Sequence, residues 1–141
     1  MTQKRALIID DEPDIRELLE ITLGRMQIHT DTADSVSSAR QMLSNHSYDL
    51  CLTDMRLPDG KGLEIVELIQ QRYPRLPVAV ITAHGSVDTA IESMKAGAFD
   101  FISKPVNLAT LRKLVNTAIE SSQLAPQQLL WMQPVRRHTN S

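Results

Sequence analysis

Residues 50–60 read LCLTDMRLPDG: an uncharged run, then an aspartate, then a segment rich in turn-forming residues. The run at 50–53 shows no alternation of apolar and charged residues, which is typical of a strand buried on both faces of a parallel sheet. Asp54 follows at once, and the composition of residues 58–62, which include Asp59, predicts a turn. The stretch therefore predicts a buried strand with an aspartate at its carboxyl end.

The same kind of run recurs along the chain and alternates with helical patterns. Strands are predicted at residues 6–9, 28–33, 50–53, 78–81 and 99–102. An amphipathic helix follows each strand, with Pro13 in a first turn and Ser35, Ser86 and Asn107 as N-caps. Five such units predict an α/β fold, a five-stranded parallel sheet that is doubly wound (flavodoxin-like) with helices on both faces. Such sheets bind ligands beyond the carboxyl ends of their strands.

Composition limits the function classes. The chain has 141 residues, 42% of them hydrophobic and only 4% aromatic, which suits one domain with an aliphatic core. All 17 acids and 13 of the 15 bases precede residue 122, so this part carries a net charge of −4. A broad basic face for nucleic acid is therefore not expected, and no apolar run approaches the roughly 20 residues of a membrane span. The single cysteine, Cys51, excludes a disulfide within the chain and fits a reducing cytoplasm.

The chain changes character near residue 122. Residues 122–141 are polar and contain Pro126 and Pro134, around a short apolar island that includes Trp131. We therefore expect a domain at residues 1–121 and a linker or tail at 122–141, in a chain that is a fragment of a longer regulator. The alternative, a tail that folds back onto the domain through Trp131, stays open.

Polar residues follow four of the predicted strands. They are Asp10-Asp11 after residues 6–9, Asp54 after 50–53, Thr82 after 78–81, and Ser103-Lys104-Pro105 after 99–102. Parallel strands bring these side chains to one edge of the sheet, where three carboxylates repel one another unless a cation lies between them. Mg²⁺ prefers such oxygen ligands. A carboxylate can also attack a phosphoryl group, with Lys104 and Thr82 available to stabilise the phosphoryl oxygens.

Taken together, these segments resemble the receiver domain of two-component response regulators over residues 4–121. The matching segments are Asp10-Asp11, residues 54–60 (DMRLPDG), Thr82-Ala83 and Lys104-Pro105. The resemblance implies that Asp54 is the phospho-acceptor and that Mg²⁺ is bound by Asp10, Asp11, Asp54 and the backbone carbonyl of Arg56. It further implies that Lys104 contacts the phosphoryl group.

The resemblance also implies a switch. Thr82 would be its hydroxyl residue and Phe101 its aromatic residue, and the Lys104–Pro105 peptide bond would be cis. Residues 82–86 and 96–101 are similar to receivers of the nitrogen-regulator class of sigma-54-dependent activators, and residues 55–60 to those that regulate type IV pilus expression. In those activators an ATPase domain and a DNA-binding domain follow the receiver, and this sequence holds no Gly-rich phosphate loop.

The implied function is a signalling switch in the cytoplasm and not an enzyme in its own right. A sensor histidine kinase would donate the phosphoryl group, and the face made by the fourth helix, the last strand and the fifth helix would change. That change would act through a homodimer, an output domain or a downstream protein, without direct contact between the receiver and nucleic acid.

Three other functions were considered. A phosphatase of the haloacid-dehalogenase type needs Asp-x-Asp after the first strand, but Glu12 stands where the second Asp belongs. A flavodoxin-like cofactor binder is not expected, because Asp10 and Asp11 would repel its phosphate. An interaction module that works without phosphorylation stays open. So do the ordinary explanations that Thr82 merely ends a strand and that Phe101 is a core residue.

Overall fold

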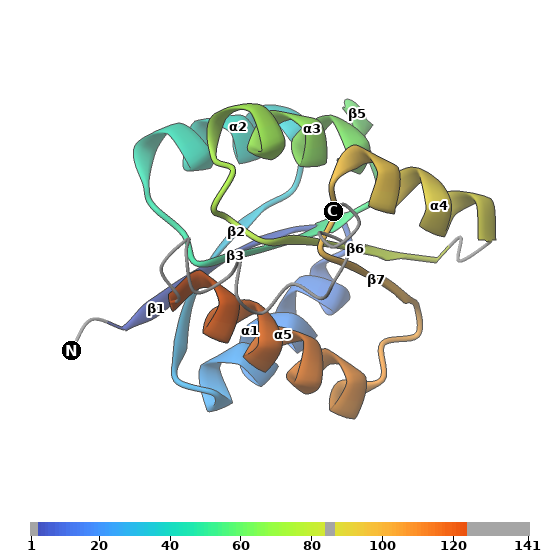
Figure 1. Cartoon of the computed structure of the whole chain (residues 1–141). Coiled ribbons are helices and arrows are strands. Elements are labelled where there is room, and N and C mark those ends of the chain that lie inside the picture. The colour runs from blue at the N-terminus through green and yellow to red at the C-terminus, as the bar shows by residue number, and fades with distance from the viewer. Residues whose placement is uncertain (1–2, 84–86, 124–141) are drawn as a thin grey trace, which may run out of the picture.

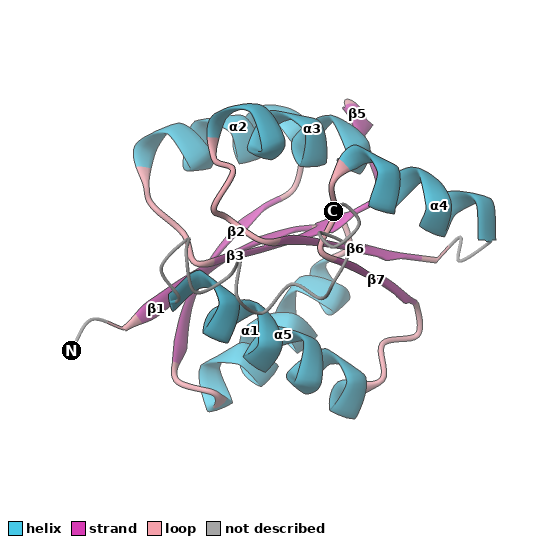
Figure 2. Cartoon of the chain, in the orientation of Figure 1, coloured by secondary structure: helices cyan, strands magenta, loops and turns pink. Residues whose placement is uncertain are grey.

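The computed structural model describes residues 3–83 and 87–123. It contains one parallel five-stranded sheet in the order β2-β1-β3-β6-β7, between two layers of helices (Figures 1 and 2). The sheet strands are β1 (Lys4–Ile9), β2 (Ile28–Ala33), β3 (Leu50–Asp54), β6 (Val78–Thr82) and β7 (Asp100–Ser103). The helices are α1 (Pro13–Arg25), α2 (Val36–Asn45), α3 (Gly62–Arg72), α4 (Val87–Ala96) and α5 (Leu108–Gln123). The doubly wound parallel fold predicted from the sequence is thereby confirmed.

A short antiparallel hairpin connects β3 to α3. Its strands are β4 (Arg56–Leu57) and β5 (Gly60–Lys61), paired Arg56 with Lys61 and Leu57 with Gly60. The predicted turn at residues 58–62 thus lies partly within this hairpin. The hairpin directly follows Asp54, so it belongs to the loop at the carboxyl end of β3.

Two aliphatic cores lie on the two faces of the sheet. Side chains alternate along each strand, so Leu7 and Ile9 of β1 pack toward α2 and α3, whereas Ala6 and Ile8 pack toward α1 and α5. Burial on both faces explains why β1, β3 and β6 lack polar alternation. Cys51 is fully buried in the first core, where burial raises the pKa of its thiol.

Local signals explain where the helices begin. Ser35 accepts the backbone N–H of Ser38 at 3.1 Å and caps α2, and Asn107 accepts that of Thr110 at 3.0 Å at the start of α5. Pro13 occupies the first position of α1, where its missing N–H costs no hydrogen bond.

Some boundaries predicted from the sequence differ by one or two residues from those in the structure. The last strand spans Asp100–Ser103 and not 99–102, and its register pairs Asp100 with Ala79 and Ser103 with Thr82. Helix α5 runs to Gln123, two residues past the predicted domain boundary at 121. The predicted N-cap Ser86 and the predicted tail from residue 124 onward lie outside the described residues. Within those described residues, no helix is both long and apolar enough to cross a membrane.

Candidate functional site

The functional candidates follow four neighbouring strands. Asp10 follows β1, Asp54 ends β3, Thr82 ends β6 and Lys104 follows β7. These strands are adjacent in the sheet order β1-β3-β6-β7, and their register pairs Asp54 with Ile81 and Thr82 with Ser103. The parallel register therefore brings all four residues to one edge of the sheet.

Lys104 lies at the centre of the site. Its Nζ atom is 3.0 Å from Oδ2 of Asp10, 3.2 Å from Oδ2 of Asp54 and 2.6 Å from Oε1 of Glu12. The Lys104 side chain is 10% exposed, Asp10 and Asp54 are buried, and the Glu12 side chain is 58% exposed. One ammonium group thus contacts two buried carboxylates and one exposed carboxylate.

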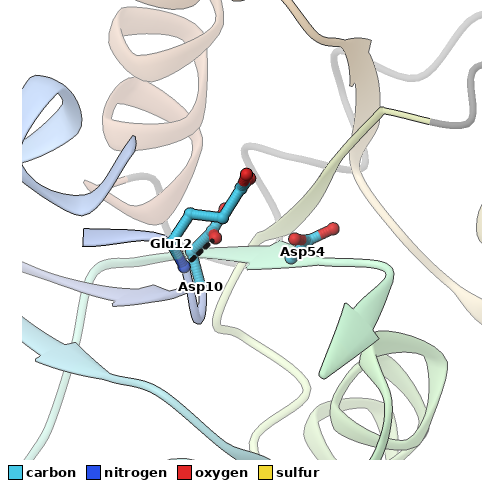
Figure 3. Close-up of side chains that lie close together, drawn as sticks. All are labelled: Asp10, Glu12 and Asp54. Atoms are coloured by element: carbon cyan, nitrogen blue, oxygen red, sulfur yellow. Dashed lines mark hydrogen bonds between the residues drawn. The ribbon is translucent and has the colours of Figure 1, made fainter. Parts of the chain in front are cut away.

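The carboxylates outnumber the cation. One oxygen atom from each of Asp10, Glu12 and Asp54 lies within 4.8 Å of the others. Figure 3 shows these three side chains. Burial raises the pKa of Asp10 and the charge of Asp54 adds to this, although hydrogen bonds from the Glu12 backbone and Lys104 oppose it. Burial alone would lower the pKa of Lys104, but its hydrogen bonds to Glu12 and Asp10 raise it. When the three carboxylates and the Lys104 ammonium group are all ionised, the cluster has a net charge of two negative units. This charge favours the binding of a cation.

The donor set fits Mg²⁺. Carboxylate oxygens on a rigid edge are the ligands this ion prefers, and it commonly uses one or two carboxylates with water and phosphate oxygens. Arg56 lies two residues beyond Asp54, and its backbone N–H is 3.4 Å from Oδ1 of Asp54. Asp11 is exposed and does not belong to the close group of acids in this arrangement.

Two backbone features hold the acidic residues in place. Oδ1 of Asp10 accepts the backbone N–H of Glu12 at 2.8 Å, and the Asp10 carbonyl accepts Nη1 of Arg16 at 2.8 Å. A Cβ atom at Gly62 would lie only 1.9 Å from the carbonyl oxygen of Asp54, so a side chain there would displace the start of α3. Glycine at this position therefore lets α3 begin directly beside the phospho-acceptor candidate.

The switch candidates lie on neighbouring strands, Thr82 at the end of β6 and Phe101 within β7. Thr82 is fully buried, and its carbonyl accepts the backbone N–H of Lys104 at 2.8 Å. Phe101 is partly buried and packs against the core that faces α2 and α3. The Lys104–Pro105 peptide bond is cis, the geometry implied by the resemblance. His84, two residues after Thr82 in the sequence, lies outside the described residues.

Sequence reasoning did not place Glu12 in the site. Glu12 is the N-cap residue of α1, with an extended backbone at φ −93° and ψ 115°. An acidic side chain at the point where a strand gives way to a helix is near the ligand edge of such a sheet, which was the signal available. Its direction depends on backbone angles that the residue order does not reveal.

Comparisons with known proteins agree with this geometry. The response regulator receiver domain family matches residues 6–116. The response regulator protein PilR of Pseudomonas aeruginosa is 64% identical over 119 residues, which are 84% of this chain and 27% of PilR. The DNA-binding transcriptional regulator NtrC of Klebsiella pneumoniae is 36% identical over 118 residues, 84% of this chain and 25% of NtrC.

Solved structures of receiver domains have a similar fold. A CheY-like receiver domain protein from Methanospirillum hungatei has a TM-score of 0.82 at 26% identity and covers 86% of this chain and 98% of its own. The beryllofluoride-activated NtrC4 receiver domain dimer has a TM-score of 0.79 at 33% identity, with 84% and 98% covered. This chain spans about a quarter of the length of PilR and of NtrC. By sequence and by fold, it belongs to the response regulator receiver domain family.

Proposed function

We propose that this domain is a phosphorylation-dependent switch in which Asp54 accepts a phosphoryl group from a sensor histidine kinase. The observation that carries the proposal is the contact of a buried Asp54 carboxylate with Lys104, beside a second buried carboxylate, Asp10. A buried nucleophile next to a fixed cation suits transfer of a phosphoryl group, whose charge is spread over its equatorial oxygens.

The proposed transfer uses the groups that the fold brings together at this edge of the sheet. An oxygen of Asp54 attacks the phosphorus of a phosphohistidine, the new O–P bond forms as the P–N bond breaks, and the departing imidazole keeps the bonding electron pair and takes a proton. Lys104 exchanges its contact with Asp54 for one with a phosphoryl oxygen, and the Thr82 hydroxyl donates to another. Mg²⁺, held by Asp10, Asp11, Asp54 and the Arg56 carbonyl, would neutralise charge on the phosphoryl oxygens.

The output would be a change in the α4–β7–α5 face. Movement of Thr82 and repacking of Phe101 would bias this face between two packings, which is a population shift. Helix α4 already exposes apolar side chains, with Val87 74%, Met94 49% and Ile91 46% exposed. A homodimer or a contact with an output domain would cover them, and the NtrC4 receiver named above is a dimer.

The wider context is part of the proposal. Because PilR and NtrC are about four times as long as the matched region, we infer that a cytoplasmic regulator continues beyond this receiver. It would control transcription with sigma-54 polymerase, and DNA contact would belong to another domain. The receiver would assist its own phosphorylation and dephosphorylation without acting as an enzyme on other substrates.

Acetyl phosphate with Mg²⁺ tests the phospho-acceptor. Wild type should gain one phosphoryl group by intact mass, and peptide mapping should place it on Asp54. Asp54→Ala should gain none, whereas Asp34→Asn, which changes an exposed aspartate, should match wild type. Modification of the Asp54→Ala variant to the wild-type extent would refute the assignment.

A further inference from the structure

The turn of the β4–β5 hairpin contacts the start of α2. Asp59 lies in this turn, and its two carboxylate oxygens accept the backbone N–H groups of Val36 at 2.7 Å and Ser37 at 3.0 Å. These are the first two residues of α2, and the third N–H, from Ser38, is accepted by Ser35. Every N–H of the first turn of α2 therefore has an acceptor, and two of the three depend on a residue 22 or 23 positions away.

The charge of Asp59 suits this contact. A carboxylate at the N-terminus of a helix is stabilised by the helix dipole and by direct hydrogen bonds to unpaired N–H groups. The hydrogen bonds from Val36 and Ser37 lower the pKa of Asp59, so its carboxyl group is ionised at neutral pH. The link is thus a pair of charge-assisted hydrogen bonds, stronger than neutral ones.

The hairpin also packs closely against α2. Leu57 and Met55 are buried in the same core as Val36. A Cβ atom at Gly60 would lie 3.1 Å from Cγ2 of Val36 and 2.5 Å from Oε2 of Glu64, so glycine permits the close approach. The hairpin that begins at Arg56 therefore follows β3 directly at one end and contacts α2 through its turn.

We propose that Asp59 is a positioning residue, whose bonds to α2 hold the Arg56 backbone relative to Asp54 and so set the affinity of the site for Mg²⁺. This inference rests on the proposed function, in which the Arg56 carbonyl is a metal ligand. Coupling of this kind is reciprocal, so Mg²⁺ at the site also stabilises the first turn of α2. Helix α2 thereby senses the state of the site although it contributes no ligand.

A matched pair of variants separates this role from plain helix capping. Asp59→Ala removes two hydrogen-bond acceptors from the start of α2 and Ser35→Ala removes one, but only Asp59 belongs to the hairpin. In a calorimetric Mg²⁺ titration, Asp59→Ala should weaken binding about tenfold, the lower end of the usual effect of residues that orient metal ligands. Ser35→Ala should match wild type. Asp59→Asn keeps one acceptor oxygen and should recover part of the lost affinity.

Amide hydrogen exchange supplies a second readout that needs no phosphorylation. Mg²⁺ should slow exchange at Val36 and Ser37 in wild type and at Ser37 in Ser35→Ala, but not in Asp59→Ala. Wild-type Mg²⁺ affinity in Asp59→Ala would overturn the inference, and so would equal losses in Asp59→Ala and Ser35→Ala. If Asp59→Ala fails to fold, the comparison of Asp59→Asn with Ser35→Ala decides in the same way. A wild-type chain that binds no Mg²⁺ would instead overturn the proposed function itself, before any variant is considered.

Discussion

Two ionic clusters in this domain use similar groups in opposite proportions. In the acidic rim, which we define as Asp10, Glu12, Asp54 and Lys104, three carboxylates contact one ammonium group. In the edge network, which we define as Arg5, His29, Asp31 and Tyr48, one carboxylate contacts several donors. Oδ2 of Asp31 lies 2.8 Å from Nη2 of Arg5 and 2.8 Å from the Tyr48 hydroxyl, and Oδ1 lies 3.3 Å from Nε2 of His29.

The difference in proportion changes how the acids ionise. Burial would raise the pKa of Asp31, but hydrogen bonds from Tyr48 and Arg5 and the charge of Arg5 outweigh it and lower the pKa. At Asp10 burial prevails and the pKa rises. Enough donors stabilise the charged form of a carboxylate, whereas in a close group of carboxylates with few donors the charged forms disfavour one another. The two clusters therefore predict different consequences when each is altered.

The largest effect is expected from Lys104→Met. Loss of the cation proposed to contact the phosphoryl oxygens should slow phosphorylation by acetyl phosphate about 100-fold, the usual cost of removing one such donor. The same change removes a competitor for the carboxylates, so the rise in melting temperature caused by Mg²⁺ should exceed that of wild type. Intact-mass time courses and thermal melts measure the two effects. Phosphorylation at the wild-type rate would remove Lys104 from the mechanism.

Asp31→Ala should affect stability and leave phosphorylation unchanged. The variant leaves Arg5 and Tyr48 without their shared acceptor, which costs about 1–2 kcal/mol of unfolding free energy for partly exposed groups. Urea denaturation measures the loss. A fall in the rate of phosphorylation, with stability retained, would show that the edge network has a role at the site.

The pH dependence of stability should report Asp31. Because its folded pKa lies below the ordinary value of 3.8, its contribution is present above that pH and is lost as the pH falls through the folded pKa. Asp31→Asn should therefore lose less unfolding free energy than wild type when the pH is lowered from about 5 toward about 3. Urea titrations across this range, in the presence of a chelator, test the sign. Parallel curves for the two proteins would contradict the lowered pKa.

The smallest effect is expected from Glu12→Gln. The Glu12 side chain is exposed, and charges exposed to solvent interact only weakly with their neighbours. Loss of the Glu12 charge should therefore change Mg²⁺ affinity less than about threefold. Asp11→Asn, which alters a proposed ligand, should weaken binding about tenfold. Calorimetric Mg²⁺ titration of both variants shows which of the two adjacent acidic residues, Asp11 or Glu12, contributes more to Mg²⁺ affinity. The reverse order would assign the ligand role to Glu12.

The residue order predicted most of the fold because the signals were local. Uncharged runs at 6–9, 50–53 and 78–81 marked strands buried on both faces, and the polar residues after them lie along one edge. Asp10, Asp54 and Lys104 come together because parallel register carries their positions to the same end of the sheet. Parallel strand direction is enough to place the carboxyl ends of the strands at one edge, and alternating strand–helix units imply that direction.

Other features depended on tertiary approach and could not be predicted. Asp59 was expected in a turn, but its bonds to Val36 and Ser37 require that the hairpin meet α2. Glu12 instead of Asp11 joins the close group of acids, and its Oε1 atom lies 2.6 Å from Nζ of Lys104, which follows a distant strand. Both cases concern side-chain direction, which composition and spacing do not determine.

The most direct test of the central claim is a calorimetric Mg²⁺ titration of wild type, Asp10→Asn and Asp31→Asn. Each variant removes one negative charge from one cluster, so the two variants have the same net charge. The claim that the unbalanced acidic rim binds the metal predicts at least a roughly tenfold loss of affinity in Asp10→Asn and wild-type affinity in Asp31→Asn. Wild-type affinity in Asp10→Asn, or equal losses in both variants, would contradict it.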